Sequence, residues 1–262
     1  MPVKKINRAT HRMWLVLLFL AFPSLLFAKS NPLRGFGECA LTTFPKPEDA
    51  DRPGCNQASC VSIDPKIKIC KCASKEPQEG DKNGVFEILK DGISQKGWPA
   101  YAYLSSSEDF EVLKGDLEGS GKTQWVVANR NSSSNGMAVS YWSVAILEDL
   151  QSFQPKVTFD LDDYGPGTFV AKKGQKGCDI LVTHWKHGKT SGEYFVGQLY
   201  QYSQGKLGPV LNFPMLGRRY RQSFENERWK GPGGRGDYQK TPLKWLASPQ
   251  TEIITNQVVA DK

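Results

Sequence analysis

The chain has very little histidine and none of the familiar catalytic histidine or serine motifs. Its only three histidines are His11, His184 and His187. No H-E-x-x-H sequence occurs, so the zinc-protease signature is absent. No G-x-S-x-G elbow is present to place a nucleophilic serine. These absences remove the best-known hydrolase signatures and leave carboxylates as the main candidates for acid–base chemistry.

Beyond residue 28 the sequence lacks a long apolar run. The only such run, Met13–Ala28, follows four basic residues, Lys4, Lys5, Arg8 and Arg12. This is the pattern of a signal peptide, and the run is too short for a comfortable membrane span. We therefore expect residues 1–28 to be cleaved after Ala28, which makes the mature protein secreted or periplasmic with no stable membrane span. An uncleaved anchor is the alternative, because Leu26 stands where a small residue is preferred.

The mature chain also lacks a strong excess of either charge. The full sequence has 34 basic and 27 acidic residues, a net charge of +7. Four of the basic residues lie in the expected signal peptide, so the mature protein has 30 basic and 27 acidic residues and a net charge of +3. The charge balance therefore gives no reason to expect a nucleic-acid partner.

All six cysteines lie in the mature part, and an even number in an exported protein predicts disulfide bonds. Five of them are clustered, and the complete set is Cys39, Cys55, Cys60, Cys70, Cys72 and Cys178. At least one of the clustered five must pair outside the cluster, and Cys178 is the only partner available there. The remaining pairing stays open. A zinc site is the competing interpretation, disfavoured because Cys70 and Cys72 are one residue apart and no histidine is near.

The composition and residue pattern of the mature chain predict an organisation in three parts. Residues 29–84 are a Cys-rich, loop-rich segment ending in a linker, residues 85–215 form a β domain, and residues 216–262 form a basic, partly irregular tail. No helical stripe is convincing, although Ser106–Leu113 has the composition of a short helix. The predicted strands are Val85–Leu89, Tyr101–Leu104, Trp125–Asn129, Ser140–Leu147, Lys156–Phe159, Thr168–Ala171, Asp179–His184, Tyr194–Tyr202 and Val210–Phe213.

The β domain contains a weak internal repeat with an offset of about 52–55 residues. Residues 112–130 align with 169–185, and residues 140–149 align with 192–201. Each unit has a Gly/Lys-rich turn that leads into an apolar strand. The expected fold class is mainly β, a partial propeller-like or sandwich domain of antiparallel sheets that carries an irregular, disulfide-rich N-terminal segment. Two units alone are too few to close a propeller.

The sequence GDLEGSGKTQWVVA at residues 115–128 resembles the FG-GAP repeat, the calcium-loop blade unit of integrin-type propellers and VCBS-like secreted proteins. The match rests on Asp116, Gly119, Gly121 and the strand Trp125–Ala128. It extends over residues 112–130 and, more weakly, over 169–202. The resemblance implies a blade-like β unit with an acidic loop before its strand.

Calcium is the cofactor that this resemblance implies, but the loop is poor in ligands. Ca²⁺ takes six to eight oxygens. The loop offers Asp116, Glu118 and Ser120, while Gln124 stands where a further carboxylate is expected and Lys122 adds a positive charge. We therefore expect no cofactor and a turn whose side-chain oxygens accept backbone hydrogen bonds.

Three other groups are candidate sites. His184 and His187 are spaced as metal ligands on a helix would be, but they follow an apolar strand, so we interpret them as exposed turn residues. Asp160, Asp162 and Asp163 form an acidic turn, the carboxylate candidate for glycosidase chemistry. A basic-aromatic patch in the tail is the best candidate for contact with a partner, and its members are Arg218, Arg219, Tyr220, Arg221 and Trp229.

With no catalytic residues identified, these observations favour an exported, non-enzymatic binding protein whose partner is another protein, for example as an inhibitor or immunity protein. A hydrolase of envelope or extracellular polymers is the first alternative, and it would need the acidic turn to face His184 across a cleft. A calcium-dependent adhesion module is the second.

Overall fold

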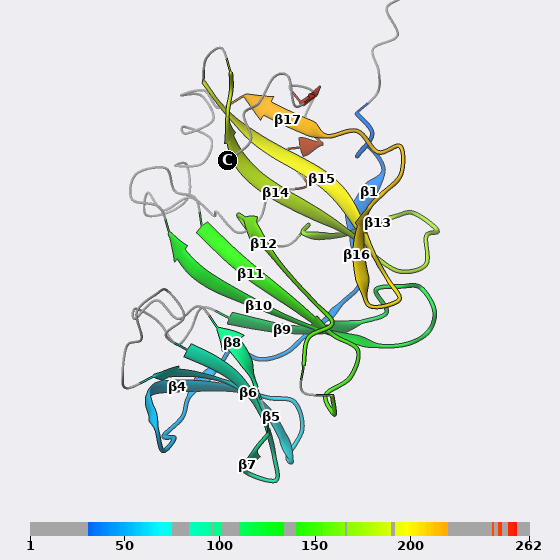
Figure 1. The fold of residues 1–262 in the computed structure, drawn as a ribbon. Helices are drawn as coiled ribbons and strands as arrows, with labels where there is room; N and C mark the ends of the chain where they lie inside the picture. The colour runs from blue at the N-terminus through cyan, green and yellow to red at the C-terminus, as the bar shows by residue number, and fades with distance from the viewer. Residues whose placement is uncertain are drawn as a thin grey trace, which may run out of the picture.

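The protein is a stack of three antiparallel β-sheets, as Figure 1 shows. The computed structural model describes residues 31–74, 84–95, 97–100, 110–133, 140–152, 154–165, 167–189, 192–219, 243, 246–247 and 251–255. Every strand pairing among these residues is antiparallel, which confirms the mainly β fold class.

The N-terminal sheet lies at the bottom of Figure 1 and has the order β3-β4-β5-β6-β7, with β8 also paired to β6. Its strands are β3 (Glu48–Asp49), β4 (Cys55–Ser62), β5 (Ile67–Ser74), β6 (Gly84–Lys90), β7 (Ile93–Ser94) and β8 (Trp98–Ala100).

The middle sheet has the order β12-β11-β10-β9-β2. Its strands are β2 (Thr42–Thr43), β9 (Phe110–Gly115), β10 (Gln124–Ser133), β11 (Ser140–Leu147) and β12 (Val157–Asp162). The C-terminal sheet lies at the top and has the order β1-β13-β14-β15-β17-β18, with β16 also paired to β15. Its strands are β1 (Phe36–Glu38), β13 (Phe169–Lys172), β14 (Asp179–His187), β15 (Glu193–Ser203), β16 (Lys206–Pro209), β17 (Leu216–Arg219) and β18 (Glu252–Ile253).

The middle sheet is buried on both faces, which explains why its central strands contain the continuous apolar runs Trp125–Ala128 and Val144–Leu147. On β10, Val126 and Ala128 pack toward the C-terminal sheet, and Val127 packs toward the N-terminal sheet. On β11, Val144 and Ile146 likewise pack toward the C-terminal sheet, and Ala145 and Leu147 pack toward the N-terminal sheet. Since successive side chains of a strand alternate between faces, a strand between two sheets needs apolar residues at every position.

The outer faces of the stack are covered in two different ways. On the C-terminal sheet, Leu181 and Phe195 are covered by Leu33 from the N-terminal end and Leu246 from the C-terminal end. On the N-terminal sheet, small residues and two disulfides take the place of a large apolar layer. The protein therefore buries the outer face of one sheet with chain termini and that of the other with cystine.

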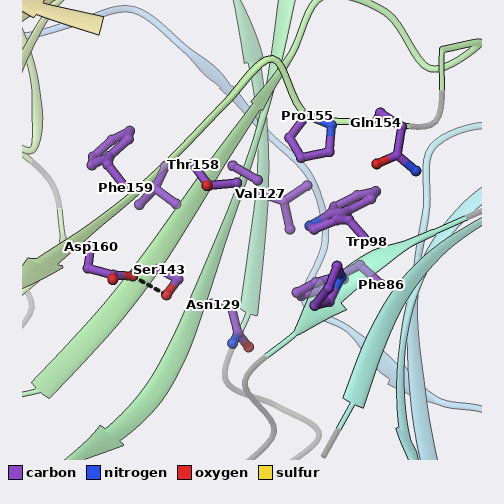
Figure 2. A pocket seen from close by; sticks show the side chains of 13 residues that line it. Phe86, Trp98, Val127, Asn129, Ser143, Gln154, Pro155, Thr158, Phe159 and Asp160 are labelled. Carbon is purple, nitrogen blue, oxygen red and sulfur yellow. Dashed lines mark hydrogen bonds between the residues drawn. The ribbon is translucent and has the colours of Figure 1, made fainter. Parts of the chain in front are cut away.

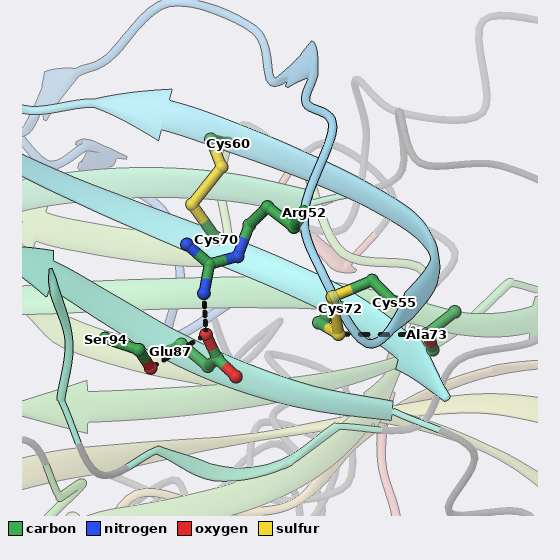
Figure 3. The surroundings of a disulfide bond; sticks show 8 residues. All are labelled: Arg52, Cys55, Cys60, Cys70, Cys72, Ala73, Glu87 and Ser94. Atoms are coloured by element: carbon green, nitrogen blue, oxygen red, sulfur yellow. Dashed lines mark hydrogen bonds and ion pairs between the residues drawn. A yellow bond between two sulfur atoms is a disulfide. The ribbon is translucent and has the colours of Figure 1, made fainter. Parts of the chain in front are cut away.

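The disulfides confirm the cysteine arithmetic. Cys39 pairs with Cys178, the one partner outside the cluster, while Cys55 pairs with Cys72 and Cys60 pairs with Cys70. No described cysteine is free. The single-residue spacing of Cys70 and Cys72 puts both on the outer face of β5, where Cys60 lies directly opposite Cys70 on β4. The spacing that disfavoured zinc is therefore the spacing of a strand with two cross-strand disulfides, which Figure 3 shows beside the Arg52–Glu87 ion pair.

Seven of the nine predicted strands are present with ends no more than four residues from those expected, while one predicted strand and the predicted helix are wrong. Phe110–Leu113 lies in β9 instead of a helix, because Phe110 and Val112 face one core while Leu113 faces the other. Val210–Phe213 is a turn, with Asn212 at a φ of 62°. Tyr101–Leu104 lies outside the described residues, as do the expected signal peptide at 1–28 and residues 106–109 of the predicted helix.

The Cys-rich segment is more regular than its composition predicts. Residues 31–54 are mostly irregular and contribute only the short strands β1, β2 and β3, but β4 and β5 are eight residues each. Polar and small residues mark these two strands as loop-like, yet they need little apolar surface because disulfides occupy their outer face. Among the described residues, no helix is long and apolar enough to cross a membrane.

Candidate functional site

A pocket of about 340 Å³ opens between the middle sheet and the N-terminal sheet (Figure 2). Phe86 of β6 and Trp98 of β8 form its aromatic wall, with their rings stacked at a centroid distance of 5.3 Å. Val127 and Ala145 of the middle sheet form its apolar floor. The other lining residues are Pro99, Asn129, Ser143, Val144, Gln154, Pro155, Thr158, Phe159 and Asp160.

The pocket forms where the shared core of the two sheets ends. Val127 and Ala145 pack against the N-terminal sheet, but the next residues on the same face of β10 and β11 are polar, Asn129 and Ser143. Gln154 bridges the two sheets at one end of the opening, where its Nε2 donates to the Gly97 carbonyl oxygen at 2.9 Å. The site is therefore a gap with one aromatic wall, one polar wall and a fixed end.

The polar wall is a hydrogen-bonded chain that crosses three strands. Asn129, Ser143 and Asp160 are directly opposite one another on β10, β11 and β12. Asn129 Nδ2 donates to Asn131 Oδ1 at 3.0 Å, Asn131 Nδ2 donates to Ser143 Oγ at 2.6 Å, and the Ser143 hydroxyl donates to Asp160 Oδ1. A register shift between Arg130 and Ser132 provides the irregularity through which Asn131 joins this chain. These groups are held in place by one another, as a binding surface requires.

This row of hydrogen-bonded side chains is not a catalytic triad, in which a base activates a nucleophile and a third group orients the base. Ser143 donates its proton to Asp160, but the described histidines, His184 and His187, lie on β14 in the C-terminal sheet. A serine without a histidine or lysine base lacks the usual means of activation. The chemistry that the pocket supports is recognition through aromatic faces, amides, a hydroxyl and one carboxylate.

One edge of β12 lies beside this pocket, and among the described residues β12 pairs only with β11. The Asp163 N–H donates to the Ser140 carbonyl oxygen at 2.8 Å. Hydrogen-bonded pairs alternate along an antiparallel ladder, so Phe159 and Leu161 face β11 as Asp163 does. Thr158 and Asp160 consequently direct their backbone N–H and C=O groups outward. The Asp162 carbonyl follows the same alternation, because it accepts the Thr183 hydroxyl of β14.

The acidic turn is only partly available for chemistry. Asp162 and Asp163 are buried, at 3% and 2% exposure. Asp162 Oδ2 accepts the Trp185 N–H at 2.7 Å, and Asp163 Oδ1 accepts the Ser140 N–H at 3.2 Å. Asp162 thereby joins the end of β12 to β14, and Asp163 Oδ2 also accepts the Trp185 Nε1–H of β14 at 3.4 Å. Only Asp160 is exposed, and it lines the pocket instead of facing His184.

The histidine pair lies in a strand and not in a turn, because β14 continues to His187. His184 is opposite Val196 and His187 is opposite Glu193 on β15. Residues three apart on a strand point to opposite faces, so these two imidazoles do not share a metal ion. No cluster of three or more potential ligands that could hold a metal occurs in the part of the chain that the structure describes.

The loop with the FG-GAP resemblance is a hydrogen-bonded turn, as predicted. Asp116 Oδ1 accepts the Ser120 N–H at 3.0 Å, and Asp116 Oδ2 accepts the Gly121 N–H at 2.6 Å. Ser120 Oγ accepts the Lys122 N–H at 3.3 Å, and Glu118 Oε1 accepts the Gln204 N–H at 2.5 Å. All three oxygen-bearing side chains proposed as calcium ligands therefore accept backbone hydrogen bonds.

Gly119 is required where this loop meets the loop before β14. Its φ is +73°, and a Cβ there would lie 2.7 Å from the carbonyl carbon of Lys176. The Cys178 N–H donates to the Leu117 carbonyl oxygen at 2.9 Å across the same junction. The glycine that carries the family resemblance thus also permits the two loops to touch.

The basic-aromatic patch falls mostly outside the described residues, which exclude Tyr220, Arg221 and Trp229. Arg218 and Arg219 lie on β17, opposite Phe195 and Tyr194, and the Arg218 side chain is half-buried. The patch stays a prediction.

A second polar pair lies between the middle and C-terminal sheets. The Tyr164 hydroxyl donates to Glu111 Oε2 at 3.4 Å, and its ring packs on Trp142 at 4.8 Å. Burial raises the pKa of the Glu111 carboxyl, and burial together with the neighbouring Glu111 raises the pKa of Tyr164 well above its usual range. A buried tyrosine that stays protonated is a fixed hydrogen-bond donor and not a base.

The sequence contains a signal for the pocket, although Asp160 alone of the lining residues is among the predicted site residues. After Val127 the apolar alternation of β10 gives way to asparagine at residues 129 and 131, and Ser143 breaks the apolar run of β11 at the opposite position. Polar residues facing each other inside two buried strands indicate the end of a core.

No family model, curated protein or solved structure matches the chain.

Proposed function

We propose that this protein is an exported, non-enzymatic binding protein that recruits an extended segment of a partner protein as an extra strand along β12. The observation that carries the proposal is the outward-facing backbone of Thr158 and Asp160 beside a preformed pocket. An unpaired strand edge supplies main-chain hydrogen bonds to an incoming peptide, and an adjacent pocket supplies side-chain specificity.

Export is supported by the signal-peptide pattern of residues 1–28 and by three disulfides, which persist in an oxidising compartment. The hydrolase alternative loses support because Asp162 and Asp163 are buried and bonded to backbone N–H groups. The calcium-dependent alternative loses support because the Asp116 carboxylate accepts two backbone hydrogen bonds.

The test is selection of linear peptides from a displayed random library on the mature, oxidised protein. Peptides selected on the wild type are then measured against Thr158→Pro and Thr158→Ala. Proline removes the outward N–H of residue 158 and is tolerated at strand edges. We expect T158P to weaken binding at least about tenfold, the scale of a lost backbone hydrogen bond, and T158A to bind nearly as the wild type does.

Thermal unfolding of both variants checks that they fold. If T158P proves unstable, amide exchange of the peptide-saturated wild type gives the same information, because strand addition protects the amides of Thr158 and Asp160. Equal binding to T158P by a folded variant, or selection of no peptide at all, would exclude strand addition. Degradation of envelope polymers that is lost in Asp160→Asn would favour the hydrolase.

A further inference from the structure

Asp160 is the only charged residue among those that line the pocket. One of its oxygens, Oδ1, accepts the Ser143 hydroxyl, and the side chain is exposed at the opening. Its hydrogen-bond partner Ser143 and the lining residue Thr158 are neutral. Among the described residues that line it, the pocket therefore presents a single negative charge and no positive one, so that a cation is the complementary ligand.

The position of Asp160 on the strand edge determines which residue of an added strand would lie next to its carboxylate. Thr158 and Asp160 both direct their side chains toward the pocket face, because residues two apart on a strand share a face. A residue of an added strand that lies directly opposite Asp160 has its side chain on that same face, with the two Cβ atoms about 4.5–5.5 Å apart. Opposite charges at that distance stabilise strand pairing.

The rest of the pocket suits the stem of such a side chain. Phe86, Trp98, Val127 and Pro155 form the apolar part of the lining, and Phe86 and Trp98 are almost fully buried, at 2% and 4% exposure. Lysine and arginine carry a charged head on an apolar stem, and their cations are attracted to aromatic faces. Figure 2 shows the carboxylate and the aromatic wall at opposite ends of the opening.

We infer that the pocket is the specificity site of the recruited strand and that it takes a basic side chain, arginine foremost, opposite Asp160. Arginine is favoured over lysine because its planar fork offers several donors in fixed directions. The Asp160 carboxylate and the Thr158 hydroxyl are two adjacent acceptors for that fork. This inference rests on the proposed strand addition to β12.

The test uses the peptides selected on the wild-type protein. We expect them to share one arginine or lysine at a fixed position in an alternating, β-forming sequence. Replacing that arginine by citrulline, which keeps the shape and removes the charge, is expected to weaken binding about tenfold or more. Asp160→Asn is expected to weaken it by a similar factor while its Oδ1 still accepts the Ser143 hydroxyl.

Asp51→Asn is the matched control, because Asp51 is exposed and lies close in sequence to Cys55, away from the pocket. The substitution removes the same charge as Asp160→Asn does. D51N should bind as the wild type does, and the citrulline peptide should be bound equally by wild type and D160N. The inference would be overturned if the selected peptides shared no basic position. It would also be overturned if the change from arginine to citrulline in the peptide weakened binding to D160N as much as binding to the wild type. Strand addition itself would still stand if T158P abolished binding in that case, so the two failures are distinguishable.

Discussion

At the scale of single residues, the same side-chain types serve as turn closers here and as metal ligands in the family that the loop resembles. Asp116 accepts two backbone hydrogen bonds with its two carboxylate oxygens. Gln124, at the position where the resemblance calls for a carboxylate, accepts the Leu117 N–H at 2.7 Å with its amide oxygen. A neutral acceptor satisfies the turn as well as an anion does when no cation has to be balanced.

Asp116→Ala is expected to lower the free energy of unfolding by about 1–2 kcal/mol, because two backbone N–H groups lose their acceptor. Ser120→Ala, which removes one longer bond of 3.3 Å, should cost about 0.5 kcal/mol or less. Urea unfolding in the presence and absence of calcium measures both effects. Calcium should leave all three proteins unchanged, since a ligand that binds the folded state would raise its stability by mass action. A calcium-dependent increase that D116A abolishes would show a working metal site.

At the scale of strands, β12 differs from its neighbours because it is short, has one partner and ends in bonds to another sheet. Its last residue, Asp162, accepts from Thr183 and Trp185 of β14, which fixes one end of the strand. Its other end follows the Gln154 bridge to the N-terminal sheet. An edge strand that is anchored at both ends presents a rigid row of main-chain groups to a partner and loses little conformational entropy on binding.

The amides of β12 in the free protein are expected to exchange in alternation. Phe159 and Leu161 should be protected by their bonds to β11, while Thr158 and Asp160 should exchange fast because their N–H groups face outward. Hydrogen exchange followed by NMR resolves the four residues individually. The amides of Val144 and Trp142 on β11, opposite Phe159 and Leu161, are the protected controls. Slow exchange at Thr158 and Asp160 without a ligand would mean that another segment already covers this edge.

At the scale of the whole molecule, one disulfide ties the N-terminal end to the last sheet. Cys39 precedes β2 of the middle sheet and pairs with Cys178 just before β14, over a separation of 139 residues. The Cys39 N–H also donates to the Phe169 carbonyl oxygen at 2.8 Å. The three short N-terminal strands each join a different sheet: β1 the C-terminal sheet, β2 the middle sheet and β3 the N-terminal sheet. The segment before residue 55 therefore crosses the stack and links its layers.

Removal of the long disulfide is expected to cost more stability than removal of a short one. Replacing Cys39 and Cys178 with alanine releases a loop of 139 residues, whereas Cys60 and Cys70 close a loop of 10. In the chain-entropy description the difference between the two is about 2 kcal/mol. Urea unfolding of the two double variants in their oxidised forms measures it. Equal losses would show that native contacts, and not loop closure, dominate these disulfides.

Several features were predictable because they depend on short-range chemistry. The apolar runs of β10 and β11, the alternation of polar turns and strands, and the Asp116 turn follow from local patterns. Counting cysteines required one bond from the cluster to Cys178. The same reasoning missed β4 and β5, because cystine replaces the apolar residues by which buried strands are usually recognised.

The sequence by itself thus determined the antiparallel β class, the even use of cysteine and the turn before β10, each set by residues close in the chain or by simple arithmetic. Only the tertiary structure decided the pocket, the outward edge of β12 and the burial of Asp162 and Asp163. Phe86, Trp98, Asn129, Ser143 and Asp160 come from five different strands of two sheets. Which of them meet depends on register and sheet stacking, and a one-residue change of register would turn each side chain to the opposite face.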